Sequence, residues 1–264
     1  MSIAFHTVFI LNENIKWLEE FIIYYLNLGI DHFYLYQNEG SEGDTGNGGT
    51  KTLNKYNFQI NTTSNENDKN MLNNILLKYG KHITHLLWQP RDDDNKIIYG
   101  QAYSVTDCII KYGQLHEWMC FLDMDEFIFS EKNVNLVEYL NSLDKNISRI
   151  ILIQKKFLDR FLSKERYITQ DFSCINNLKI GTEWAPKNII RCRDFIGLSN
   201  IHNINTKNNT IVAGIDTLRF NHYNVNDKQL AWMKGFYNRS SPFTITDIDD
   251  GMKRYKNLFD HADI

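Results

Sequence analysis

The chain has 264 residues, of which 42% are hydrophobic and 13% aromatic, and its formal net charge is −3. This composition supports one domain with a sizeable core and excludes a disordered, fibrous or small disulfide-stapled protein. The 29 Lys and Arg residues are balanced by 32 acidic residues and form no basic stripe, which excludes nucleic acid as the main partner.

Several features bear on the cellular compartment. The sequence has neither a long uninterrupted apolar run nor a signal-peptide start, so we expect no transmembrane segment, no signal peptide and a cytoplasmic location. The four cysteines show no CxxC spacing, which favours reduced, buried thiols. Aromatic and basic residues near the C-terminus, including Trp232, Phe236 and Arg254, are compatible with weak peripheral membrane contact. A face packed on a sheet explains their spacing more simply.

The N-terminal segment is predicted to be a strand, a helix and a second strand. Residues 4–11 form an apolar run, helical spacing of apolar residues follows from a predicted N-cap at Asn14 to Gly29, and the aromatic segment 32–38 has strand composition. A strand, helix and strand in this order predict two parallel strands with a right-handed crossover.

The next part of the chain continues the alternation of helices and strands. Residues 61–70 are polar without periodicity and predict an exposed excursion, whereas 71–79 and 101–111 are predicted helices and 83–88 a predicted strand. The second helix leads into the sequence WMCFLDMDEFIF, residues 118–129. We therefore expect repeated βα units before this segment.

Segment 118–129 is the main functional candidate. Its apolar run stops at Asp123, Asp125 and Glu126, and in an extended chain the two aspartates would share one face. Two carboxylates on one side suit Mg²⁺ or Mn²⁺, which in turn can hold a diphosphate. A solvated acidic turn at a strand end is the alternative for the tripeptide taken alone.

The C-terminal half carries shorter elements. The acids Asp247 and Asp249 are predicted to cap the last helix instead of binding metal. Together with the first half, these elements predict a single α/β domain with a mixed, mostly parallel sheet flanked by helices. The predicted helices are 135–143, 227–238 and 247–258, and the predicted strands are 149–154, 187–193, 201–204 and 217–223.

Four stretches, in order along the chain, resemble glycosyltransferases of the GT-A fold, specifically family 92 and its family-2-like relatives. One departure is FLDRFLSKERY at 157–167, where relatives carry small residues and a Gly-His pair. The resemblance implies a Rossmann-like GT-A domain over 1–264, with a nucleotide-sugar-binding half at 1–130 and an acceptor-side half at 131–264. The matching stretches are LNENIKWLEEFIIYYLNLGIDHFYLYQN, QAYSVTDCIIKYGQLHEWMCFLDMDEFIF, KNIIRCRDFIGLSNIH and NHYNVNDKQLAWMKG.

The resemblance implies metal-dependent, inverting transfer of a sugar from a nucleotide-diphosphate donor to a glycan or other hydroxyl acceptor. UDP-galactose is the favoured donor because family members of known activity use it. Asp125 is the first candidate for direct ligation of Mn²⁺ or Mg²⁺, with Asp123 contacting the ribose or the metal. His222 is the expected histidine ligand and His202 the second choice, although each could be a hydrogen-bonded histidine at a strand end.

The same resemblance implies binding residues for the nucleoside: Asn12, Glu13 and Asn38, with Gln101 and Asp107 as weaker candidates. Asn12 and Glu13 could instead cap the first helix. Lys187 and Arg191 are cations with even spacing on one face of a predicted strand, and could bind the diphosphate or pair with surface acids.

The catalytic base is expected to be Asp159 or Glu183, which both follow the candidate metal-binding segment 118–129 in the chain. Asp159 is preferred because it interrupts an apolar run, and either residue could be a surface acid. Two other functions use the same residues: a non-catalytic carbohydrate- or nucleotide-binding module, and a metal-dependent nucleotidyltransferase.

Overall fold

The computed structural model describes residues 1–41, 63–157, 167–175, 185–223, 225 and 246–260. The two candidate bases, Asp159 and Glu183, lie outside the described residues, as does the predicted helix 227–238.

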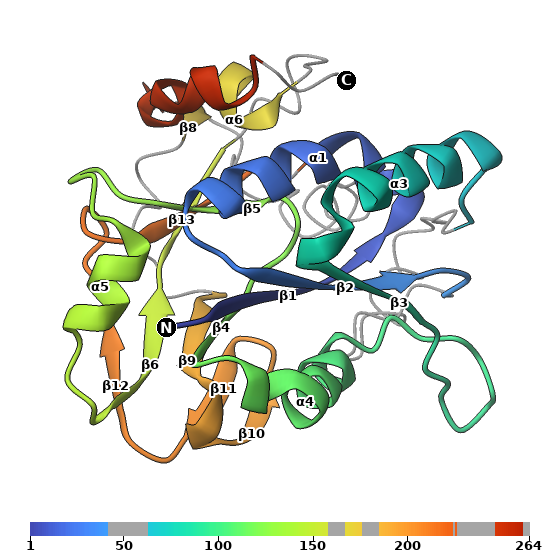
Figure 1. Ribbon diagram of the computed structural model, residues 1–264, viewed down its shortest axis with the longest axis horizontal. Helices are drawn as coiled ribbons and strands as arrows, with labels where there is room; N and C mark the ends of the chain where they lie inside the picture. The colour runs from blue at the N-terminus through green and yellow to red at the C-terminus, as the bar shows by residue number, and fades with distance from the viewer. Residues whose placement is uncertain (42–62, 158–166, 176–184, 224, 226–245, 261–264) are drawn as a thin grey trace.

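The centre of the molecule is a mixed seven-stranded sheet with the strand order β12-β6-β9-β4-β1-β2-β3 (Figure 1). All neighbouring strands run parallel except β9, which is antiparallel to both β4 and β6. A mixed, mostly parallel sheet was predicted and is confirmed. The strands are β1 Ile3–Ile10, β2 His32–Asn38, β3 Ile83–Trp88, β4 Trp118–Phe121, β6 Ile147–Leu152, β9 Lys187–Arg191 and β12 Asn209–Val212.

Helices cover both faces of the sheet because β1 is apolar on both sides. Phe5 and Phe9 pack with helices α1, Leu11–Asn27, and α3, Glu66–Tyr79. Val8 packs on the other face with α4, Gln101–Tyr112. The hairpin of β10, Phe195–Asn200, and β11, Asn203–Thr206, lies beside α4 (Figure 1). None of the described helices is both long and apolar enough to cross a membrane.

A three-stranded sheet, with the order β5-β13-β7, lies next to α1. The hydroxyls of Tyr24 and Tyr25 on α1 donate hydrogen bonds to Ile128 O at 2.5 Å and Glu126 O at 2.8 Å, and so fix β5 against the helix. The remaining elements are β5 Glu126–Phe129, β7 Gln154–Lys156, β8 Cys174–Ile175, β13 Arg219–His222, β14 Asp247–Ile248, α5 Leu136–Ser142, α6 Ile168–Asp171 and the 3₁₀ helices Gly80–His82, Gly113–Leu115, Cys192–Asp194 and η6 Gly251–Leu258.

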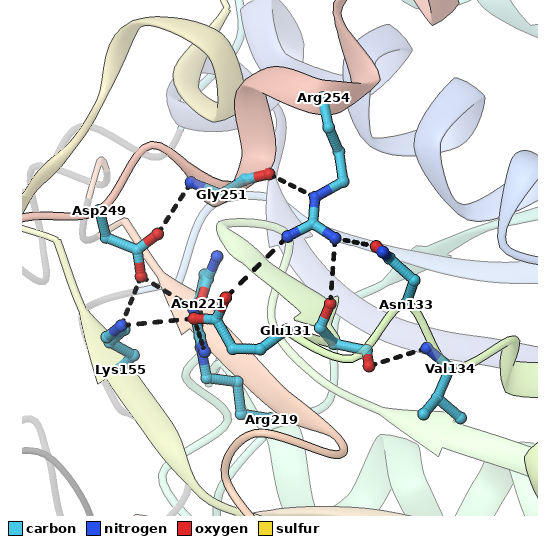
Figure 2. A network of polar contacts seen from close by, with 10 residues as sticks. Glu131, Asn133, Val134, Lys155, Arg219, Asn221, Asp249, Gly251 and Arg254 are labelled. Atoms are coloured by element: carbon cyan, nitrogen blue, oxygen red, sulfur yellow. Dashed lines mark hydrogen bonds and ion pairs between the residues drawn. The ribbon is translucent and has the colours of Figure 1, made fainter.

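A charged network ties the segment 247–258 to this smaller sheet (Figure 2). Asp249 Oδ2 accepts hydrogen bonds from Lys155 Nζ at 2.5 Å and from Arg219 Nη2 at 2.8 Å. Arg219 is 1% exposed, pairs with Glu131 at 2.6 Å and lies over the ring of Phe129. Its charge is therefore buried but fully partnered, as buried charges must be.

Three local predictions were wrong. Helix α1 begins at Leu11, and the Asn14 side chain accepts a hydrogen bond from Ile10 N at 3.2 Å from within the first turn. Helix α3 begins inside the predicted polar excursion, because Asn65 and Asp68 form a capping box. The last predicted helix is a short strand, β14, followed by the 3₁₀ helix η6, although Asp249 Oδ1 does accept a hydrogen bond from Gly251 N.

Candidate active site at the end of strand β4

The acidic segment turns back on itself directly after β4. Met124 and Asp125 form a turn, in which Glu126 N donates to Asp123 O at 3.1 Å and Asp123 N donates to Glu126 Oε2 at 2.8 Å. The prediction of an extended segment with Asp123 and Asp125 on one face is therefore wrong. The turn gives the two aspartates different neighbours.

Asp123 is held on both carboxylate oxygens. Oδ1 accepts a hydrogen bond from Gln101 Nε2 at 2.5 Å, and Oδ2 lies 2.7 Å from Lys187 Nζ. Burial raises the pKa of Asp123, but the Lys187 ammonium outweighs it and holds this pKa below its usual range. The side chain is 30% exposed, so an ionised carboxylate faces solvent here.

Lys187 also pairs with Glu126, whose Oε2 lies 3.0 Å from the ammonium nitrogen. Both side chains are buried, at 4% and 1% exposure. Burial raises the pKa of Glu126 to about 7, and Lys187 opposes this shift. Burial lowers the pKa of Lys187, but the two carboxylates more than compensate, so the lysine stays charged. Glu126 was not among the predicted ligands, although it directly follows the aspartate pair.

Asp125 and His222 meet at the other side of the turn. Asp125 is 2% exposed, and its Oδ2 lies 3.5 Å from His222 Nε2 and accepts a hydrogen bond from Val225 N at 3.3 Å. His222 Nδ1 lies 3.7 Å from Glu126 Oε1, because the register of β13 against β5 places these two residues opposite each other. The structure thus brings His222 to the predicted acids from about a hundred residues away along the chain.

His202 lies in the turn between β10 and β11. Its Nδ1 donates a hydrogen bond to Pro186 O at 3.1 Å. Burial and the Lys187 charge lower the pKa of His202 to about 4, so its imidazole is neutral at physiological pH. Arg149 holds this turn, since it donates to His202 O at 3.3 Å and to Asn188 Oδ1 at 2.7 Å.

A pocket lined in part by Lys187 lies between β1, β4 and α4. Among its lining residues is His6, which is 2% exposed and whose pKa burial lowers to about 3. His6 was read from the sequence as part of an apolar strand and was not singled out. The pocket is lined by His6, Thr7, Val8, Gln101, Val105, Phe121, Leu122, Lys187 and Ile201.

The other predicted binding residues are distributed unevenly. Asn12 and Glu13 lie in the first turn of α1, directly beyond the carboxyl end of β1. Asn38 ends β2, is fully buried and donates to Trp88 O and Ile98 O at 2.9 and 3.0 Å. Its Oδ1 is buried and has no hydrogen-bond partner among the described residues.

Two predicted residues lie apart from the acidic turn. Arg191 sits at the far end of β9 from Lys187, where it pairs with Glu117 and covers the ring of Trp118. Asp107, within α4, accepts a hydrogen bond from the Tyr36 hydroxyl at 2.7 Å. Of the two cations proposed for the diphosphate, only Lys187 reaches the acidic turn.

The donor set at this turn has the chemistry of an Mn²⁺ or Mg²⁺ site, with carboxylate oxygens and one imidazole. Within the described ranges, however, no three acidic, histidine or cysteine side chains converge closely enough to coordinate one ion. The Lys187 ammonium already pairs with Asp123 Oδ2. The residues therefore fit a metal chemically, provided that Lys187 moves off Asp123.

These features define an α/β protein with a polar site at the carboxyl end of a central strand, which is where open α/β sheets bind ligands. Residues 6–255 match the family described as Glycosyltransferase family 92. The chain belongs to this glycosyltransferase family, as its sequence motifs indicated.

One solved structure similar to the chain is that of S. aureus TarS, residues 1–349. The two share 9% sequence identity with a TM-score of 0.41, over 91% of this chain and 73% of the TarS chain. No similar sequence was found among the curated proteins.

Proposed function

We propose that the protein is a metal-dependent glycosyltransferase of GT-A architecture, which transfers a sugar from a UDP-sugar to a hydroxyl of a glycan or another acceptor, with inversion. UDP-galactose is the favoured donor. One observation carries the proposal: in a chain of family 92, the acids of the β4 turn, Lys187 and His222 converge at the carboxyl end of a central strand.

The metal would be held by Asp123, Asp125 and His222, with His202 as the second histidine candidate. When bound, Mn²⁺ or Mg²⁺ supplies positive charge to the leaving diphosphate. Asp123 and Asp125 come from one turn and His222 from β13, so a metal site would require these three side chains to move closer together while the turn is kept. Glu126 fixes that turn through Asp123 N and orders Lys187 through its second contact.

Lys187 would supply a second positive charge. In the absence of ligand its ammonium neutralises Asp123 and Glu126. A divalent ion at Asp123 would take over that neutralisation, and the ammonium, still protonated because of the nearby acids, would then be available to a phosphate oxygen. The lysine would thus exchange one anionic partner for another without changing its protonation state.

The nucleoside would lie beyond the ends of β1 and β2, in the half of the chain at 1–130. Asn12, Glu13 and Asn38 lie at these strand ends, and the buried Asn38 Oδ1 is an acceptor that a base or ribose donor can satisfy. Gln101 contacts Asp123 directly and Asp107 does not, so Gln101 is the better of the two weaker candidates.

The acceptor would be bound by the half at 131–264, which also carries the proposed base. Asp159, or Glu183, would remove the proton of the attacking hydroxyl on the face of the sugar opposite the diphosphate. Asp159→Asn should abolish transfer while UDP binding is retained, and full activity of this variant would exclude Asp159 as the base.

The test of the function is release of free nucleoside diphosphate. The protein is incubated with Mn²⁺, a panel of UDP- and GDP-sugars and a mixture of simple saccharide acceptors. Release of UDP that disappears in Asp125→Ala but persists in Asp93→Asn, an exposed acid outside the site, supports glycosyl transfer. Release of pyrophosphate would indicate a nucleotidyltransferase, and binding of UDP without turnover would indicate a binding module.

A further inference from the structure

A chain of hydrogen bonds connects a buried histidine of β1 to the acidic turn. His6 Nε2 lies 3.0 Å from Ser104 Oγ, and the Ser104 hydroxyl donates to Gln101 O at 2.8 Å. Gln101 Nε2 in turn donates to Asp123 Oδ1 at 2.5 Å. Both Ser104 and Gln101 lie in the first turn of α4, so the chain passes through the start of one helix.

The direction of the His6–Ser104 hydrogen bond is inferred from the second contact of the Ser104 hydroxyl. A carbonyl oxygen only accepts, so the single hydroxyl proton of Ser104 goes to Gln101 O. The contact between His6 and Ser104 therefore requires the proton to be on His6 Nε2, which donates to Ser104 Oγ. Burial keeps the imidazole neutral at physiological pH, and the tautomer that the two Ser104 contacts imply is Nε2–H.

The polarity of His6 is not explained by packing. Its neighbours on this face of the sheet are apolar, and its ring lies 5.0 Å from the ring of Tyr36 and 5.4 Å from that of Phe121. An aromatic hydrocarbon side chain would fill the same space without the cost of burying two ring nitrogens. The hydrogen bond to Ser104 is the feature that a phenylalanine would not reproduce.

The start of α4 needs such support. Gly100 precedes the helix with a φ of +59°, and a Cβ there would lie 2.5 Å from Pro90 Cγ, so the chain enters the helix through a tight bend. As a glycine, the N-cap residue has no side chain with which to cap this N-terminus. Ser104, bonded to both His6 and Gln101 O, links the first turn to β1.

We propose that His6 is a positioning residue for the site: through Ser104 it fixes the first turn of α4, so that the Gln101 amide holds the Asp123 carboxylate with Oδ1 towards the helix and Oδ2 towards Lys187. With a metal bound, the same contact would leave the other Asp123 oxygen available to the ion, and this last step rests on the proposed function. Loss of a residue that orients a metal ligand through hydrogen bonds typically lowers metal affinity by about 10- to 100-fold.

The first measurement needs no metal. The side-chain amide resonances of Gln101 are identified in ¹⁵N NMR spectra by their absence in Gln101→Leu. In His6→Phe these resonances are expected to move towards the positions of a solvent-exposed glutamine, and in His6→Gln, whose Nε2 reaches about as far as that of histidine, to return towards wild type. In wild type, the ¹⁵N shifts of His6 should show the Nε2–H tautomer between pH 5.5 and about 8.

The second measurement is the affinity for Mn²⁺ alone by calorimetry. His6→Phe and Ser104→Ala should each weaken binding about tenfold, His6→Gln should restore most of it, and His6→Phe should add little in a Gln101→Leu background because the two residues act through one contact. His85→Phe is the matched control: His85 lies on β3 of the same sheet and bonds Gln37 Oε1 at 2.8 Å.

The outcomes separate the positioning role from the proposed function. Unchanged Gln101 resonances in both His6→Phe and Ser104→Ala would overturn the positioning role, and so would Mn²⁺ affinity equal to that of wild type in both. If wild type itself binds no Mn²⁺, the metal in the proposed function is refuted, and the Gln101 resonances alone decide the role of His6. If His6→Phe fails to fold, the smaller change Ser104→Ala decides both measurements.

Discussion

Lys187 Nζ lies 2.7 Å from Asp123 Oδ2, and this contact joins residues that are 64 positions apart in the chain. The antiparallel strand β9 makes the contact possible, because its register against β4 places Lys187 at the carboxyl end of that strand. The ammonium also reaches Glu126, so one buried cation pairs with two acids. Under the proposed function, a divalent ion and Lys187 would compete for the Asp123 carboxylate.

This competition predicts the behaviour of Lys187→Met. Without ligand the variant should lose about 3 kcal/mol of stability, because the buried Glu126 and the partly exposed Asp123 lose their partner. It should bind Mn²⁺ more tightly than wild type does, and Mn²⁺ should raise the melting temperature of the variant by more than it raises that of wild type. Calorimetric unfolding with and without Mn²⁺ measures both effects.

Lys69→Met is the control for this prediction, since Lys69 belongs to an exposed ion pair on α3 whose removal should change little. Equal Mn²⁺ affinity in Lys187→Met and wild type would show that lysine and metal do not share Asp123.

The two histidines are expected to differ in their effect on metal binding. His222 approaches both Asp125 and Glu126, whereas the Nδ1 of His202 is used by Pro186 O. His222→Ala should therefore weaken Mn²⁺ binding by more than about tenfold, and His202→Ala by clearly less. Calorimetric titration of the two variants at pH 7.5 compares them directly, and a larger loss in His202→Ala would exchange the two assignments.

Much of the sheet could be predicted from the sequence, and the acidic turn could not. Strands β1 to β4 and helix α4 are long apolar or periodic segments, so their residues alone indicate them. The turn at Met124 and Asp125 depends on a hydrogen bond from Asp123 N to the side chain of Glu126, and alternation of residue types carries no sign of that. His6 was missed for a related reason, because the two polar residues His6 and Thr7 do not alter the apolar pattern of an eight-residue buried strand.

The partners of the site residues were harder to predict than the residues themselves. Lys187 was expected to bind phosphate, but its contact with Asp123 depends on the register between β9 and β4, which no local pattern specifies. Arg191 lies on the same face of the predicted strand as Lys187, and both were therefore expected to bind the diphosphate. Arg191 is four residues further along β9, however, so it lies at the other end of that strand, where it pairs with Glu117. Periodicity gives the face of a strand and not its position along the sheet.

A buried acid outside the site predicts a pH dependence of stability. Glu20 on α1 accepts hydrogen bonds from Ile168 N at 3.0 Å and Thr169 N at 2.8 Å, yet burial raises its pKa from 4.5 to about 7. Because the folded state binds this proton more tightly than the unfolded state, its contribution is complete below pH 4.5 and is lost as the pH rises through about 7.

The expected loss from Glu20 is about 3 kcal/mol over this interval. In Glu20→Gln it should be absent, so the stability of the variant relative to wild type should increase between pH 5 and pH 8. Denaturant unfolding at four pH values in this interval measures the difference, and Glu19→Gln on the same helix is the control. A constant difference between Glu20→Gln and wild type would contradict the assignment.

The charged network of Figure 2 gives a prediction with the opposite sign. Burial raises the pKa of Asp249, but its hydrogen bonds with Lys155 and Gly251 N and the charge of Arg219 hold this pKa below its usual range. Its contribution to stability is therefore present above the unfolded-state pKa and is lost as the pH falls through the folded-state value. Asp249→Asn should cost about 3 kcal/mol at pH 7, because Lys155 and Arg219 lose a buried partner, and clearly less at pH 3.

Asp250→Asn provides the matched control for Asp249→Asn, since the neighbouring acid is exposed and pairs only with the exposed Lys253 among the described contacts. The network should also influence the site, because Arg219 begins the strand that His222 ends. If Asp249 secures β13, Asp249→Asn should weaken Mn²⁺ binding as well as stability, while Asp250→Asn should alter neither. Loss of stability with unchanged Mn²⁺ affinity would mean that β5 and β7 hold β13 in register without the network.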